Sequence, residues 1–167
     1  NFAEKELINL ISLKEKLDEL KNTYESGQVE IQIESVRAWI EYAKGNNDKA
    51  INFMKLATEL ESKTSKAAVT PGEIIPAEEL LGDLYLALDK PQLALNSYEN
   101  NLKSRPYRFN GIYGAAKAAL KLNNIKLASY YFQQLIQLSP DINNPRPEII
   151  EAKNFLSKKS VKIADNA

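Results

Sequence analysis

The side chains best suited to chemistry in this sequence fall into two charged pairs on predicted helices. Glu79 and Asp83 lie four residues apart, a spacing that places both carboxylates on one helix face, where they could bind a metal ion or transfer protons. Lys117 and Lys121 have the same spacing and could hold a carboxylate or a phosphate. Each pair could equally be an ordinary solvated helix surface, and Glu79 could also form an ion pair with Lys117.

Two residue types on which most catalytic sites depend are missing. The 167 residues include no Cys and no His, which removes the commonest pairs of nucleophile and base and the usual zinc ligands. The sequence also lacks a Gly-rich phosphate loop and a nucleophile elbow. We therefore expect a protein that is not an enzyme and has no metal or cofactor.

Composition indicates a soluble chain with an uneven distribution of charge. The sequence is 44% hydrophobic and 26% charged, and it has no run of about 18 apolar residues that would span a membrane. Residues 1–83 carry 10 Lys and Arg against 16 Asp and Glu, a balance of −6, and residues 84–167 carry 12 against 6, a balance of +6. We expect a cytoplasmic or periplasmic protein, without a choice between the two.

A spacing of 34 residues organises the second half of the chain. Small or bulky residues recur at this interval in four pairs: Gly82 with Ala116, Ala94 with Ala128, Tyr98 with Phe132, and Pro106 with Pro140. A fixed period of this length is typical of two-helix units stacked side by side. Small residues allow the two helices of a unit to approach closely, and the aromatic residue fills the space beside that contact. The spacing therefore predicts an all-α repeat protein.

The motif Leu81-Gly82-x-x-Tyr85, followed by Ala94-x-x-x-Tyr98 and Pro106, resembles the tetratricopeptide repeat. Glu78 replaces the Trp of that pattern. The resemblance implies a right-handed superhelix of about three helix pairs with flanking helices. We expect one domain divided into an opening helix (1–27, with the helix itself at 2–24 and Gly27 breaking it), repeat 1 (28–64), an insertion loop (65–74), repeat 2 (75–108), repeat 3 (109–143), a capping helix (147–159) and a frayed tail (160–167).

Three segments, 69–72, 76–83 and 108–116, resemble the C-terminal repeat region of bacterial multi-repeat proteins. This resemblance implies a bacterial origin and a piece of a longer array, and it brings no assigned reaction. Relatives often carry a Lys-His pair before the first segment, whereas Lys66 is followed here by Ala67 and Ala68.

In repeats of this type the first helix of each pair lines a concave face, so the resemblance implies a surface for a protein or peptide partner. Trp39 is the strongest candidate because aromatic residues are enriched at interfaces, although it could instead fill the space under the opening helix. The predicted partner-binding residues are Trp39, Tyr42, Glu79, Asp83, Asn110, Tyr113, Lys117 and Lys121. The identity of the partner is left open.

Some tetratricopeptide domains clamp the acidic C-terminus of a chaperone with Lys, Asn and Arg side chains. The matching positions here are Ser35, Trp39, Leu80, Asn110 and Gly114, so we do not expect that activity.

Two other kinds of partner are suggested by the residues. The run Arg105, Tyr107, Arg108 and Phe109 interleaves cations with aromatics, as in single-strand binders. A sequence pI of about 6.6 argues against nucleic acid, and at a repeat junction such residues often pack. The apolar side of residues 2–24 could pair with a second copy and form a homodimer.

Overall fold

The computed structural model describes residues 2–64, 75–139 and 145–164, and these residues form helices connected by turns, with no strand among them. The chain divides into two compact units, Asn1–Leu88 and Asp89–Ala167. The predicted all-α class is therefore confirmed. The predicted insertion loop (65–74), the end of repeat 3 (140–143) and the end of the predicted tail (165–167) lie outside the described residues.

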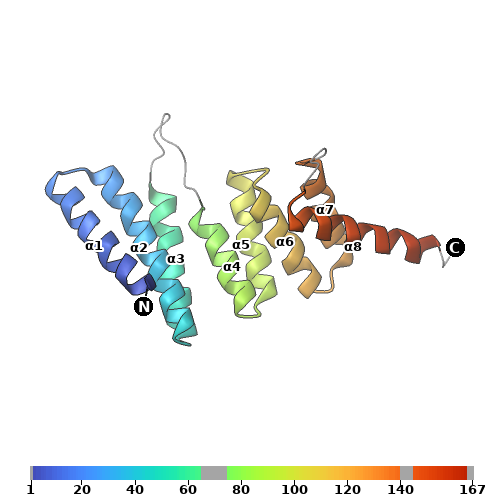
Figure 1. The fold of residues 1–167 in the computed structure, drawn as a ribbon, viewed down its shortest axis with the longest axis horizontal. Helices are drawn as coiled ribbons and strands as arrows, with labels where there is room; N and C mark the ends of the chain where they lie inside the picture. The colour runs from blue at the N-terminus through green and yellow to red at the C-terminus, as the bar shows by residue number, and fades with distance from the viewer. Residues whose placement is uncertain (1, 65–74, 140–144, 165–167) are drawn as a thin grey trace. The chain divides into compact units, whose positions relative to one another are not determined.

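The first unit contains α1 (Phe2–Glu19), α2 (Thr23–Ala43), α3 (Asn47–Lys63) and α4 (Ala77–Ala87). Helix α2 packs against both α1 and α3, and α4 packs mainly against α3 while also touching α2 (blue to green in Figure 1). The core of this unit is built from fully buried aliphatic and small residues on α2, α3 and α4, among them Ile33, Ala38, Met54, Ala57 and Leu84.

The second unit contains α5 (Pro91–Ser104), α6 (Phe109–Lys121), α7 (Ile125–Gln137) and α8 (Pro147–Ala164). Helix α6 packs against α5 and α7, and α8 packs against α7 (Figure 1). Ala94 and Tyr98 are fully buried, and so are Ala128 and Phe132, their partners at the 34-residue interval. The period thus identifies equivalent core positions, because small and aromatic residues make the same kind of helix contact in successive repeats.

The turns between helices depend on residues in the left-handed backbone region. Gly45 has φ 81°, whereas Lys21, Asp89 and Asn123 have φ between 53° and 56° although they carry side chains. A residue in this region just after a helix lets the following backbone N–H groups bond to the last carbonyls and ends the helix. Pro91 occupies the start of α5, where its missing N–H costs no hydrogen bond.

Three predicted boundaries differ from the structure. The opening helix ends at Glu19 rather than at residue 24, because Lys21 turns the chain and α2 begins at Thr23. Gly27 does not break a helix and lies inside α2. The C-terminal helix continues to Ala164, so the first part of the predicted frayed tail is helical.

Candidate functional site

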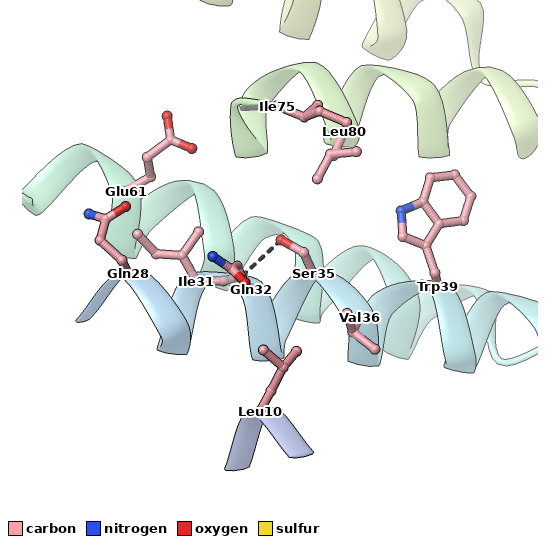
Figure 2. A pocket seen from close by; sticks show the side chains of 10 residues that line it. All are labelled: Leu10, Gln28, Ile31, Gln32, Ser35, Val36, Trp39, Glu61, Ile75 and Leu80. Atoms are coloured by element: carbon pink, nitrogen blue, oxygen red, sulfur yellow. Dashed lines mark hydrogen bonds between the residues drawn. The ribbon is translucent and has the colours of Figure 1, made fainter. Parts of the chain in front are cut away.

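A partly open cavity of about 360 Å³ lies in the first unit, among α1, α2, α3 and α4. Figure 2 shows α2 running along its base, with Leu10 of α1 below and Leu80 of α4 on the other side. Five of its ten lining residues are aliphatic, and Trp39 closes one end (Figure 2). The cavity can therefore receive an apolar group of about the size of a large side chain.

Some of the polar side chains around this cavity already have a hydrogen-bond partner within the protein, and others do not. The Ser35 hydroxyl donates to the carbonyl oxygen of Ile31 in the same helix at 2.8 Å. Glu61 accepts a hydrogen bond of 2.6 Å from the backbone N–H of Ala77, which satisfies the start of α4. Within the described ranges no hydrogen bond engages the side-chain amides of Gln28 and Gln32. These two amides are free to bind the backbone of an extended ligand.

Trp39 and Tyr42 form an aromatic corner at the end of the cavity. Their ring centroids are 5.7 Å apart with an interplanar angle of 88°, an edge-to-face contact. The Tyr42 hydroxyl lies 3.5 Å from the carbonyl oxygen of Ala87 on α4. Both rings are half-buried, so each is held in place by its neighbours and still presents a surface to solvent.

The carboxylates of Glu79 and Asp83 do not share one environment. Glu79 is only 1% exposed, whereas Asp83 is exposed at the next turn of α4. Four residues advance a helix by about 40° more than one full turn. With this offset one side chain is buried and the other is exposed to solvent. Among the described residues, no cluster of three acidic side chains is arranged to hold a metal ion.

In the second unit, Tyr113 and Lys117 meet at a carboxylate of the protein itself. The Tyr113 hydroxyl and the Lys117 ammonium each donate a hydrogen bond of 2.6 Å to Glu151 of α8. Burial and the bond to Glu151 raise the pKa of Tyr113, which keeps it a neutral donor. Burial alone would raise the pKa of Glu151, but the bonds from Lys117 and Tyr113 outweigh it and hold that pKa below its usual value.

The remaining two predicted residues lie at the ends of α6. Asn110 is exposed in the first turn. Lys121 is exposed in the last turn, with its ammonium 2.6 Å from a carboxylate oxygen of Asp89. The predicted residues of α6 are accessible to solvent at least in part. The sequence did not identify Glu151 or Asp89 as partners of its lysines, nor Gln28 as a cavity residue.

No family model and no curated protein matches this sequence. A solved structure does: the Arabidopsis OM64 TPR domain is 15% identical, with 80% of this chain and 98% of that domain covered and a TM-score of 0.59. The chain therefore has the fold of a tetratricopeptide repeat domain, as the motifs indicated. In the part of the chain that the structure describes, no helix combines the length and apolarity needed to cross a bilayer.

Proposed function

We propose that this chain is a non-catalytic module that binds a protein or peptide partner, with the Trp39 cavity as its main contact. The supporting observation is the cavity itself: apolar walls, a half-buried Trp at one end and two unengaged glutamine amides along one side. Such an arrangement fits an apolar anchor side chain whose flanking backbone is held by the amides. The tetratricopeptide fold supports a role in protein interaction in general.

The charge of the first unit indicates what should flank that anchor. Residues 84–88 carry no charge, so Asn1–Leu88 has the same balance of −6 as residues 1–83, and Asp89–Ala167 has +6. A partner segment with basic residues beside its anchor would be attracted to the first unit. Tyr42 and Asp83 are the predicted contacts for its flanks. In the second unit, Asn110, Tyr113, Lys117 and Lys121 remain proposed contacts, and the two lysines would first have to exchange their own carboxylate partners.

Selection from a random peptide library, displayed on phage, tests this function. We expect the wild-type chain to enrich peptides with a bulky apolar residue next to Lys or Arg. Trp39→Ala should weaken their binding about tenfold or more, since a buried aromatic anchor contact commonly contributes over 1 kcal/mol. Leu56→Ala is the matched control, because Leu56 is an exposed apolar residue of α3 away from the cavity. Equal binding by Trp39→Ala would remove the cavity from the proposal.

Self-association is the second candidate, and exposed apolar residues on α1 and directly after it favour it. Phe2, Ile8, Leu13 and Leu20 are 79%, 67%, 45% and 76% exposed, and an exposed apolar patch is typical of an interaction surface. A second copy of the chain would cover them. Sedimentation equilibrium over a range of concentrations should then show a dimer that Leu13→Lys disrupts, and a monomer at every concentration would contradict the idea.

A further inference from the structure

A second cavity, of about 340 Å³, lies within the second unit and shares no residue with the Trp39 cavity. It is formed by α5, by the turn after it, and by α6 and α7. Three tyrosines line it, Tyr107, Tyr130 and Tyr131, together with Lys103, Pro106 and Gln134. We refer to it as the tyrosine cleft.

One wall of the tyrosine cleft is fixed by hydrogen bonds between its side chains. The Tyr131 hydroxyl donates to a Glu99 carboxylate oxygen at 2.9 Å, and the Gln134 amide donates to the Tyr130 hydroxyl at 2.9 Å. The two rings pack at 5.3 Å and 64°. Having accepted the bond from Gln134, the Tyr130 hydroxyl still has its own hydrogen to donate, and its ring is 52% exposed. The cleft therefore offers a preorganised aromatic surface with a free donor.

Tyr107 stands on the turn that follows α5 and has an unfavourable backbone conformation. Its φ is 67°, in the left-handed region that side chains with a Cβ rarely adopt, and its side chain is 75% exposed. Neither backbone preference nor burial accounts for a tyrosine here, where Gly or Asn would be less strained. The turn after α5 accounts for the left-handed conformation, as at Lys21, Asp89 and Asn123, but it does not require an aromatic side chain.

Lys103 adds a positive charge to the rim. Its ammonium donates to the side-chain oxygen of Asn100 at 3.0 Å, a neutral partner, and no ion pair reaches it from the described residues. An anionic group on a ligand would therefore find an uncompensated cation beside the tyrosine rings.

From this geometry we propose that the tyrosine cleft binds an acidic, proline-rich segment of a partner protein in the polyproline II conformation. Proline rings stack on exposed aromatic faces such as those of Tyr107 and Tyr130. A polyproline II helix has no internal hydrogen bonds, so its carbonyl oxygens can accept from the Tyr130 hydroxyl. An acidic residue beside the prolines would pair with Lys103.

Nucleic acid, the other ligand that stacks on aromatic rings, fits this cleft less well. Glu99 lines the cleft and would repel a continuous phosphate backbone, whereas a peptide needs only one acidic residue, placed beside Lys103. Phe109, the second aromatic of the Arg-Tyr-Arg-Phe run, has the Arg146 guanidinium 4.0 Å from its ring centroid, so one of its faces is already covered. The run does not present its two rings as a continuous stacking surface.

Titration of the ¹⁵N-labelled full chain with the peptide PPDPPPDPP, followed by two-dimensional NMR, tests the proposal and locates the site. We expect amide shifts at Tyr107, Tyr130 and Gln134. Tyr107→Asn, which suits the left-handed backbone, and Tyr130→Ala should each weaken binding about tenfold. The peptides AADAAADAA and PPKPPPKPP should bind more weakly, the first because it lacks proline rings and the second because it meets Lys103 with like charge. Trp39→Ala should bind PPDPPPDPP as the wild type does.

The same spectra show whether each variant is folded, so lost binding can be assigned to the cleft. The proposal is overturned if PPDPPPDPP causes no shifts at millimolar concentration, if the shifts lie outside the cleft, or if a folded Tyr107→Asn variant binds unchanged. Tighter binding of oligothymidylate at the same residues would replace the peptide with nucleic acid. None of these results bears on the Trp39 cavity, which is tested separately in the first unit.

Discussion

Lys117 on α6 and Glu151 on α8 form an ion pair of 2.6 Å between residues that are 34 positions apart. This interval equals the repeat period. Helix α8 therefore corresponds in position to the first helix of a further repeat. Burial follows the same interval, since Ala115 and Ala118 are fully buried and so are their counterparts Ile149 and Ala152. The C-terminal helix, predicted only as a cap, therefore continues the repeat on the face where it meets α7.

Replacing Glu151 with Gln should lower the free energy of unfolding at neutral pH. The pair is more than one third exposed, so solvent screening limits its contribution to about 0.5 kcal/mol. Because the folded-state pKa of Glu151 lies below its usual value of 4.5, this contribution is present above that pH and is lost as the pH falls through the folded-state pKa. Denaturant unfolding of wild type and Glu151→Gln near pH 7 and pH 3 should show a difference that disappears in acid.

The control for this experiment is Glu59→Gln on α3. Glu59 also pairs with a lysine, Lys63, but both side chains are largely exposed, so its removal should change stability little at either pH. A Glu151→Gln variant as stable as wild type at neutral pH would mean that the bonds from Tyr113 and Lys117 do not stabilise the fold.

Glu34 on α2 should show the opposite pH dependence. It is 2% exposed, its Oε1 pairs with Arg37, and its buried Oε2 has no hydrogen-bond donor in the described structure. Burial raises its pKa, against the effect of Arg37, and the nearby Glu30 carboxylate raises it further. A raised pKa stabilises the fold below the unfolded-state value of 4.5, and this stabilisation is lost as the pH rises through the folded-state pKa.

Glu34→Gln should therefore gain stability relative to wild type as the pH rises from about 4 to 7, because the amide cannot ionise. Arg37 can lose its partner at low cost, since it is 37% exposed and can be hydrated. Thermal unfolding across this pH range measures the effect. The contrary result is a variant that loses stability relative to wild type and loses more of it at pH 7 than at pH 4. That result would show that the fold favours the ionised carboxylate.

Two glycines inside helices should respond in opposite directions to substitution by Ala. A Cβ on Gly27 would meet nothing within 4 Å, so Gly27→Ala should stabilise α2 by about 0.5–1 kcal/mol through helix propensity. A Cβ on Gly114 would lie 2.3 Å from the nearest ring atom of Tyr98, a fully buried residue. Gly114→Ala should therefore destabilise the fold by about 1–3 kcal/mol through overpacking. Urea unfolding of the two variants decides this, and a shift of both in one direction would refute the packing argument.

The repeat core could be predicted from sequence because its residues carry a recognisable signal. Ala94, Tyr98, Ala128 and Phe132 recur at a fixed interval, and small or aromatic residues at that interval report close helix contacts. The turn at Lys21 carried no such signal, because a lysine in the left-handed region looks like any solvated residue. Gly27 carried a misleading one, since an interior helix glycine is tolerated at modest cost.

The site was predictable only where it depends on one helix. Trp39 and Tyr42 are three residues apart on α2, so their contact follows from helix geometry. The burial of Glu79 and the pairing of Lys117 with Glu151 depend on how separate helices pack, which local spacing does not specify. A glutamine on a helix is usually solvated, so residue type alone does not mark Gln28 or Gln32 as a binding residue, and the cavity is what gives both a role.

The fluorescence of Trp39 provides the most direct measurement of the central claim, since it is the single tryptophan of the sequence and lines the cavity. Peptides enriched on the wild-type chain should shift its emission to shorter wavelength, because the anchor side chain displaces water from the partly open cavity. The dissociation constant obtained from this shift should equal that from an independent binding assay. Emission that stays unchanged while such a peptide binds would place the partner elsewhere and contradict the account.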